Sequence, residues 1–270
     1  MYSDASNVAY AGYEVGTVNG VAHGAWDPEE MKKSSTWREL CAVYRVLLSL
    51  IHVLGSQRVK WFTDNKGVSS IVSKGSMKSD LQILAMKIFD FTAKNAIHLE
   101  VEWVPRDENS RADYLSKIVE KDDWGIGIDI FEMIVHKWGM LEVDVFASEH
   151  NAKLKTFFSR FWCSGSAGID AFTFEWSKFF GLYVPPIILI PRVLNKMLYC
   201  KARGVLVLPE WKSAGFWPLV CGHDGHLCTF VKDMIVLPSE KEFYVPCKNG
   251  VGIFGTENLK FRMLALYVEF

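Results

Sequence analysis

The stretch RVKWFTDN, from Arg58 to Asn65, decides the fold of the first half of this chain. Val59, Trp61 and Thr63 alternate with Lys60 and Phe62, which is the two-residue period of a β-strand with one buried face. The strand ends at an acid, Asp64. Asp-Asn is an ordinary turn pair, so Asp64 taken alone predicts only a turn.

The segments before this strand predict a small meander and a helix. MYSDASNVAYAGYEVG (residues 1–16) and GVAHGAWD (20–27) contain three short strand-like runs separated by Gly and Asn turns. Apolar residues between Leu40 and Ile51 then recur at helical spacing, with Thr36 and Glu39 fitting a capping box at the start. We expect an antiparallel meander followed by an amphipathic helix.

The segments after this strand continue the alternation. SDLQILAMKIFDFTAKN (79–95) predicts a helix capped by Ser79, and only this helix is expected between Asp64 and Trp103. IHLEVEWVP (97–105) predicts a strand, and NSRADYLSKIVE (109–120) a helix that buries Ala112 and Leu115. The first half is therefore predicted to be an α/β layer structure, with a mixed sheet flanked by helices.

A composition shift at EKDDWG (120–125) predicts a domain boundary between Val119 and Asp123, which gives domains of residues 1–120 and 121–270. In the second part, Phe131, Ile134 and Trp138 predict a helix. Strands are expected at LEVDVFAS (141–148), IILIPRVL (187–194), GVLVLPEW (204–211) and FRMLALYVEF (261–270), so a second, smaller α/β domain follows. Trp176, Trp211 and Trp217 are predicted to be core residues and not a base-stacking platform.

The amino-acid composition and net charge exclude some classes of protein. Half of the 270 residues are apolar, and the net charge of −1 excludes a protein that holds nucleic acid by bulk positive charge, so any such contact is local or assisted by metal. The most apolar run is broken by prolines and Arg192, which predicts an intracellular protein of the cytoplasm or nucleus without a membrane partner. Six cysteines without regular spacing predict reduced thiols, and CGHDGHLC (221–228) is open to two interpretations, a polar turn or a zinc site.

Four acids occupy related positions at the ends of predicted elements. Asp4 and Asp64 lie at strand ends, Glu39 lies at the edge of a buried helix face, and Asp113 lies at a helix start. Each has an ordinary structural explanation, such as a turn, a cap or the helix dipole. If the strands are adjacent, however, the acids converge, and crowded carboxylates repel one another unless divalent cations neutralise them. Two such ions about 4 Å apart support in-line phosphoryl displacement.

The motifs YSDAS, WRELCAV, FTDN and NSRADYLSK, in this order, resemble the D…E…D…D pattern of type 1 ribonuclease H domains over about the first 117 residues. The wording VPRDENSRADYLSK is similar to copies in retroelement polyproteins, DIRS-like tyrosine-recombinase retrotransposons in particular. The resemblance implies a mixed five-stranded sheet and endonucleolytic hydrolysis of the RNA strand of RNA/DNA hybrids. It further implies two Mg²⁺ ions, with Mn²⁺ as a substitute, a reverse transcriptase of the same element as partner, and four metal-binding catalytic acids: Asp4, Glu39, Asp64 and Asp113.

The resemblance also suggests substrate contacts at Ser6, Asn65, Ser69 and Arg106, although Ser6, Asn65 and Ser69 are better explained as turn or capping residues. Arg106 lies in the loop where many members carry a histidine that helps product leave. The basic helix with which some members hold hybrid is expected to be missing, which predicts weak autonomous binding. Only three residues precede Asp4, which predicts a fragment of a longer polyprotein.

DIRS-like elements also carry a downstream region similar to adenine methyltransferases, and Asp144 with Pro185 and Pro186 falls at the corresponding positions. Val184 and Ile187 depart from the catalytic tetrapeptide of that family, so we expect an inactive, structural second domain. For the whole chain, the alternative hypothesis is a truncated, catalytically inactive remnant that binds nucleic acid or protein.

Overall fold

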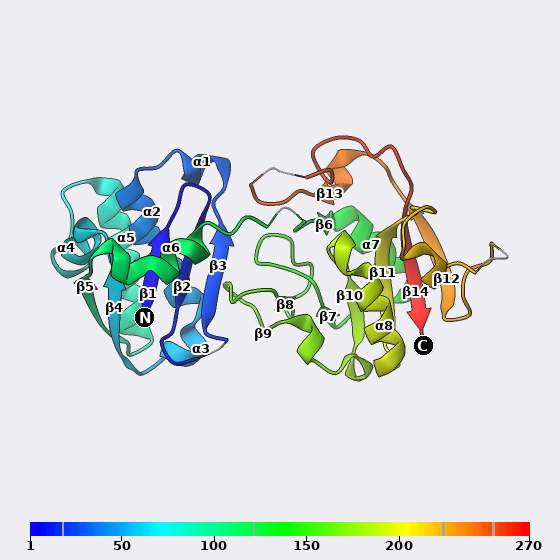
Figure 1. Ribbon diagram of the computed structural model, residues 1–270, viewed down its shortest axis with the longest axis horizontal. Helices are drawn as coiled ribbons and strands as arrows, with labels where there is room; N and C mark the ends of the chain where they lie inside the picture. The colour runs from blue at the N-terminus through cyan, green and yellow to red at the C-terminus, as the bar shows by residue number, and fades with distance from the viewer. Residues whose placement is uncertain (18, 121, 223–224, 250–251) are drawn as a thin grey trace. The chain divides into compact units, whose positions relative to one another are not determined.

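The computed structural model describes residues 1–17, 19–120, 122–222, 225–249 and 252–270. The chain divides into two compact units (Figure 1). The first unit comprises Met1–Glu120 and Phe161–Ser164, and the second comprises Lys121–Arg160 and Gly165–Phe270. The second unit is the longer of the two, which corrects the expectation of a smaller second domain.

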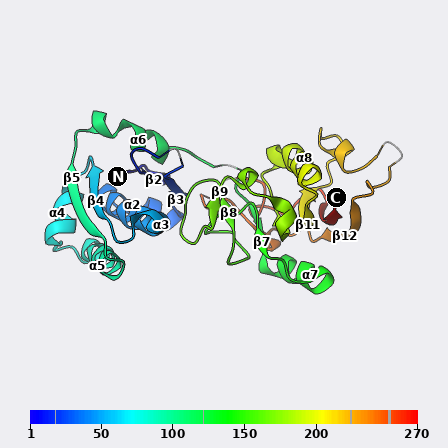
Figure 2. The same cartoon turned by 90° about the horizontal axis from the view of Figure 1, so that it is seen from below.

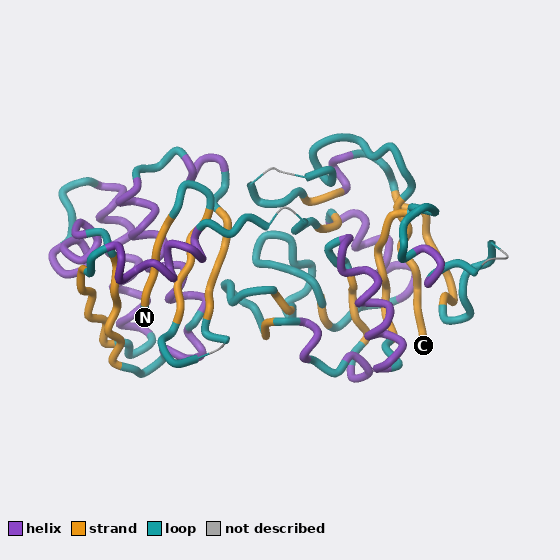
Figure 3. The backbone as a smooth tube through the Cα atoms, viewed as in Figure 1, coloured by secondary structure: helices purple, strands orange, loops and turns teal. Residues whose placement is uncertain are grey.

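The first unit is built on a mixed five-stranded sheet with the order β3-β2-β1-β4-β5. The meander is formed by β1 (Tyr2–Ala5), β2 (Ala9–Tyr13) and β3 (Val21–Ala25), which pair antiparallel. The strand β4 (Arg58–Thr63) pairs parallel with β1, and β5 (His98–Trp103) pairs parallel with β4. Figure 3 shows the strands in orange. The predicted meander and both later strands are confirmed.

Helices cover both faces of this sheet (Figure 2). On one face lie α2 (Ser35–Ser49), α3 (Ile51–Leu54), α4 (Lys66–Lys74) and α5 (Ser79–Lys94); on the other, α6 (Ser110–Ser116) packs against β1 and β2. Short turns of helix precede α2 and α6, namely α1 (Pro28–Met31) and η1 (Arg106–Asn109). The predicted mixed sheet flanked by helices is therefore confirmed.

The alternating strand places its large side chains in the core. Val59, Trp61 and Thr63 are buried, and the Trp61 Nε1 donates a hydrogen bond to Ser3 Oγ at 2.8 Å. The apolar stripe of α2 packs on the same core. In α6, the buried residues are Ala112 and Ser116, whereas Leu115 is only partly buried.

The prediction about the start of α2 was wrong. The cap of α2 is Ser34, whose Oγ accepts from the Trp37 N–H, so Thr36 lies inside the helix and forms no capping box with Glu39. The capping box of this region is formed by Asp27 and Glu30 at α1.

Between Asp64 and Trp103 the chain forms two helices, α4 and α5, where one was predicted. Gly75 ends α4 with a φ of 78°, a left-handed conformation that glycine tolerates. The N-cap of α5 is Lys78, not Ser79, and it makes no side-chain capping hydrogen bond.

A four-residue segment from the second half of the sequence, Phe161–Ser164, belongs to the first unit. Trp162 forms a short parallel bridge with Ala22 on the outer edge of β3. Its Nε1 donates to the Asn19 carbonyl oxygen at 2.8 Å, and the centroid of its ring lies 4.0 Å from the centroid of the His52 ring. This segment covers part of the exposed edge of β3, and the first unit therefore uses residues from beyond residue 120.

The second unit contains a sheet with the order β12-β14-β11-β10-β7. The strands β7 (Val143–Asp144), β10 (Phe180–Tyr183) and β11 (Arg203–Pro209) are parallel, and β14 (Met263–Glu269) runs antiparallel to β11 and to β12 (Val231–Leu237). The helices are α7 (Ile128–Trp138) and α8 (Ile190–Cys200). Two further pairs of short strands are β6 (Gly125–Ile126) with β13 (Tyr244–Val245), and β8 (Phe158–Ser159) with β9 (Gly168–Ile169).

The strand predicted at IILIPRVL was wrong, because this segment begins α8 after a short 3-10 turn at Ile187–Leu189. Pro191 occupies the first turn of the helix, where its missing N–H leaves no hydrogen bond unmade. Ile190, Val193 and Leu194 then recur at helical spacing and are buried. The strands predicted at GVLVLPEW and FRMLALYVEF are confirmed as β11 and β14.

The three tryptophans predicted to be core residues belong to one apolar cluster of the second unit: Trp176 is fully buried, and the partly buried Trp211 and Trp217 pack against it. In the CGHDGHLC segment, His223 and Asp224 lie outside the described residues, and Cys221 forms a backbone bridge with Leu227.

In the described part of the chain, no helix is both long and apolar enough to cross a bilayer.

Candidate metal centre

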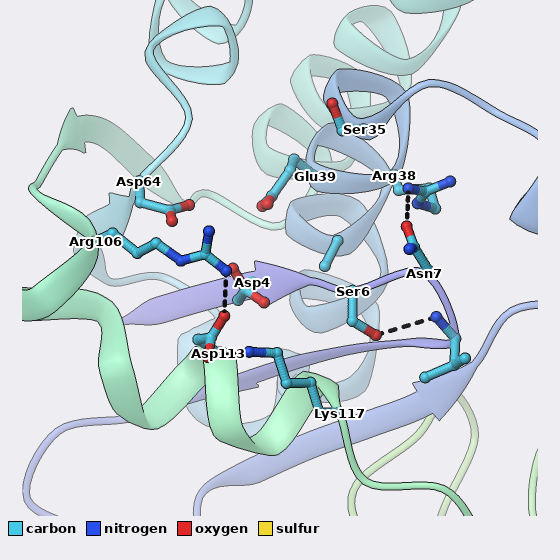
Figure 4. A pocket seen from close by; sticks show the side chains of 12 residues that line it. Asp4, Ser6, Asn7, Ser35, Arg38, Glu39, Asp64, Arg106, Asp113 and Lys117 are labelled. Carbon is cyan, nitrogen blue, oxygen red and sulfur yellow. Dashed lines mark hydrogen bonds and ion pairs between the residues drawn. The ribbon is translucent and has the colours of Figure 1, made fainter.

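Three acids meet where β1 and β4 end (Figure 4). The register Tyr2↔Phe62 places Asp4 of β1 level with Asp64, which directly follows β4. Glu39 reaches the same place from α2, which packs on β1. Asp4, Glu39 and Asp64 each offer a carboxylate oxygen, and these oxygens lie within 4.8 Å of one another. Among the described residues, this is the one group of three or more His, Cys, Asp or Glu side chains close enough together to hold a metal ion.

The turn after β4 is held by local hydrogen bonds. Asn65 caps α4, and its Oδ1 accepts from the N–H groups of Gly67 and Val68. The indole Nε1 of Trp103, at the end of the neighbouring β5, donates to the Asp64 carbonyl oxygen at 3.0 Å. The backbone of Asp64 is thus fixed from two sides.

The environment of Glu39 is unfavourable for an isolated carboxylate. The residue is 7% exposed, and its Oε2 is buried without a hydrogen-bond partner. Burial, and after it the charges of Asp4 and Asp64, raises the pKa of Glu39 well above its usual value. An unpaired buried carboxylate oxygen is strongly destabilising unless a cation binds it.

Asp4 has a similar environment with one compensating contact. The residue is 5% exposed, and burial raises its pKa, while a hydrogen bond from Ser116 acts in the opposite direction. The charges of Asp64 and Asp113 raise the pKa further. Three carboxylates crowded in this way form an all-oxygen donor set, which fits a hard divalent cation such as Mg²⁺.

Asp113 lines one pocket together with these three acids, but its charge is already neutralised by two basic side chains. Its Oδ1 accepts from Arg106 at 2.9 Å and its Oδ2 from Lys117 at 2.5 Å. These two hydrogen bonds, that from Lys117 first, lower the pKa of Asp113. Three of the four predicted acids therefore form a cluster that could hold a metal ion, and the fourth, Asp113, lines the same pocket in two ion pairs.

The pocket has a volume of about 500 Å³ and also contains a buried arginine, Arg38. The guanidinium donates through one nitrogen to the carbonyl oxygens of Met31 and Lys33, and through the other to Asn7 Oδ1 at 2.7 Å. Arg38 thus links the β1–β2 turn to the segment that leads into α2.

The predicted substrate-contact residues separate into two pairs. Ser6 and Arg106 line the pocket, whereas Asn65 and Ser69 are not among the described residues that line it. Ser6 is engaged within the protein, because its Oγ accepts from the Val8 and Ala9 N–H groups and donates to the Ser116 carbonyl oxygen. Asn65 is the cap described above.

Reasoning from the sequence missed Asn7, Arg38, Ser116 and Lys117 at this site. Ser116 donates to Asp4 Oδ2 at 2.5 Å, and Lys117 pairs with Asp113. The spacing held a usable signal, because residues three and four positions after Asp113 share its helix face.

The predicted methyltransferase-like residues have structural contacts in the second unit. The buried Asp144 accepts from the Lys153 N–H at 2.9 Å, and burial raises its pKa to about 7. The Pro185 carbonyl oxygen accepts from Trp124 Nε1 at 3.2 Å.

Replacing both Arg106 and Lys117 with glutamine is expected to increase the affinity for Mn²⁺ about threefold to tenfold. Removing two cations reduces repulsion of the incoming ion and frees the Asp113 carboxylate. Calorimetric titration with Mn²⁺ measures this, with the exposed Lys87→Gln on α5 as control. Unchanged or weaker binding in the double variant would show that these ion pairs do not compete with metal.

No family model matches the chain, and no curated protein matches it. Several solved structures are similar to part of it. Ribonuclease H1 from the halophilic archaeon Halobacterium salinarum NRC-1 shares 19% identity over 42% of this chain and 90% of that chain, with a TM-score of 0.34.

LC11 ribonuclease H1 in complex with an RNA/DNA hybrid shares 17% identity over 42% and 90% of the two chains, with a TM-score of 0.36. The N-terminal ribonuclease H domain of a Mycobacterium tuberculosis protein shares 18% identity over 42% and 84%, with a TM-score of 0.34. At this level of similarity, the function has to be inferred from the chain's own residues and not from these structures.

Proposed function

We propose that this chain is a metal-dependent endonuclease that hydrolyses the RNA strand of RNA/DNA hybrids, a ribonuclease H activity. The observation that carries this proposal is the convergence of Asp4, Glu39 and Asp64, with a buried and unpartnered oxygen on Glu39. Such an arrangement destabilises the protein without a cation and is suited to binding one.

We propose that the site holds two divalent ions. Asp4, Glu39 and Asp64 would hold one ion, and Asp4 with Asp113 would hold the other. We propose Mg²⁺ as the natural ion and Mn²⁺ as a substitute, because all the ligands are carboxylate oxygens. When bound, the ions would supply an activated water and stabilise the leaving oxygen of the phosphodiester.

The chain's own residues would do the remaining work. The backbone contacts around Asp64 and the helix α2 behind Glu39 hold these acids in place. Arg106 and Lys117 supply exposed positive charge at the same pocket, where a phosphodiester has to enter. This local charge suits a chain whose net charge of −1 gives no general attraction for nucleic acid.

The choice of substrate rests on the four motifs, which resemble type 1 ribonuclease H domains in order and wording. The same wording supports a retroelement origin. We propose that a reverse transcriptase of the same element supplies the substrate, because copying RNA into DNA leaves an RNA/DNA hybrid. Selectivity for RNA would require contacts with the 2′-hydroxyl groups.

The test is cleavage of a hybrid with a 5′-labelled RNA strand by the purified chain, with Mg²⁺, Mn²⁺ or EDTA in parallel. We expect metal-dependent cutting of the RNA strand that leaves 5′-phosphate and 3′-hydroxyl ends. Duplex DNA and single-stranded RNA of the same sequence are the matched substrates and should remain intact. A folded chain that cuts no hybrid in either metal, or that cuts duplex DNA equally well, contradicts the proposal.

A further inference from the structure

We propose that Ser116 is a positioning residue for Asp4, which fixes the carboxylate that the two proposed ions would share. This inference rests on the proposed function in taking Asp4 as a metal ligand. It concerns a residue whose side chain lies behind the acid and does not itself need to touch metal or substrate.

The first observation is the contact itself. Ser116 is fully buried at the end of α6, and its Oγ lies 2.5 Å from Asp4 Oδ2 and 3.0 Å from the Asp113 carbonyl oxygen. A serine hydroxyl has a single proton to donate. The shorter contact is to the charged acceptor, so the Ser116 hydroxyl donates its hydrogen bond to the Asp4 carboxylate.

The second observation is that two independent hydrogen bonds hold α6, which carries the hydroxyl, in place. Ser6 Oγ donates to the Ser116 carbonyl oxygen at 2.6 Å. Before the first turn of α6, the buried Asn109 Nδ2 donates to the Ser3 carbonyl oxygen at 3.0 Å. Both ends of α6 are therefore tied to β1 or to the turn that follows it, and the donor cannot drift away from Asp4.

The consequence concerns the orientation of one carboxylate. One oxygen of Asp4 is engaged by Ser116, which limits rotation of the carboxyl group and directs the remaining acceptor capacity toward Glu39 and Asp64. Because Ser116 also contacts the Asp113 carbonyl oxygen, it sets Asp4 and Asp113 relative to each other.

The first test compares Ser116→Ala with wild type in Mn²⁺ binding, measured by calorimetry. Loss of a group that orients a metal ligand typically weakens metal affinity or activity about tenfold to a hundredfold. We expect a loss in this range, together with a lower kcat for hybrid cleavage and a KM changed less than about threefold. The control is Ser49→Ala, a buried helical serine whose Oγ donates to the Arg45 carbonyl oxygen on α2. It should lower the unfolding midpoint without changing Mn²⁺ affinity.

Two further variants separate positioning from packing. Ser116→Thr keeps the hydroxyl and should retain Mn²⁺ affinity within about threefold of wild type. Ser116→Cys fills the site with a somewhat larger thiol that is a much weaker donor, so it should lose Mn²⁺ affinity, and it provides the test if the alanine variant does not fold.

Two outcomes overturn the inference. One is a folded Ser116→Ala variant that binds Mn²⁺ within twofold of wild type, and the other is equal affinity loss in the Thr and Cys variants. A wild-type chain that binds Mn²⁺ in a Ser116-dependent manner but cuts no hybrid supports this inference and contradicts the proposed nuclease function.

Discussion

Replacing Asp64 with asparagine is expected to lower the rate of hybrid cleavage about a thousandfold or more, which corresponds to about 4 kcal/mol of lost transition-state stabilisation. Asp64 is one of three acids whose oxygens lie within 4.8 Å of one another, so its removal leaves the candidate ion with two of its three close ligands. The fold should persist, because the backbone carbonyl oxygen of Asp64, which accepts from Trp103, is kept in the variant. Single-turnover cleavage of a labelled hybrid in Mg²⁺ measures the loss.

The control for this variant is Asp90→Asn, an exposed acid on α5 that does not line the pocket. It makes the same chemical change and should cut at the wild-type rate. Thermal unfolding in EDTA should give the Asp64→Asn variant a midpoint no lower than that of wild type, because one charge beside Asp4 and Glu39 is removed. A folded, fully active Asp64→Asn chain would refute the assignment of Asp64 to the metal centre.

The sequence predicted the first sheet well because its signal is local. Val59, Trp61 and Thr63 alternate without interruption, and the buried face follows directly from that period. The failure at IILIPRVL has the opposite cause, since a short apolar run has no decisive period and Pro191 is compatible with a helix start as well as a loop. The segment Phe161–Ser164 was missed because its partner, Ala22, lies far away in the sequence.

The candidate site was predictable in its acids but not in their pairing. Asp4 and Asp64 could be placed together because adjacent parallel strands end at one edge of a sheet. The ion pairs of Asp113 depend on where η1 brings Arg106, which no pattern within the sequence specifies. Glu39 shows a further limit, because its place at the edge of the buried helix face was predicted but the capping box with Thr36 was not formed, since α2 begins earlier and is capped by Ser34.

Replacing Glu39 with glutamine is expected to stabilise the metal-free protein by about 1–3 kcal/mol at neutral pH, the usual magnitude for one buried polar atom without a partner, here Oε2. Burial and the charges of Asp4 and Asp64 raise the folded-state pKa of Glu39 above its ordinary value of 4.5. The stability that this group contributes is therefore complete below about pH 4.5 and is lost as the pH rises through the raised pKa. Glutamine has no charge to bury, so the advantage of the variant should appear above pH 4.5 and disappear below it.

Urea unfolding between pH 4 and pH 8, in EDTA and in Mn²⁺, measures this effect. Saturating Mn²⁺ should reverse the order at neutral pH, because ions that bind only the folded state stabilise wild type by RT ln(1 + [Mn²⁺]/Kd), and the variant has lost a ligand. Glu100→Gln, an exposed acid on β5, is the control and should show the wild-type response to both pH and metal. A Glu39→Gln variant that is less stable than wild type in EDTA at pH 7 would mean that the carboxylate is held by contacts within the protein. In that case its unpartnered oxygen would no longer indicate a cation site.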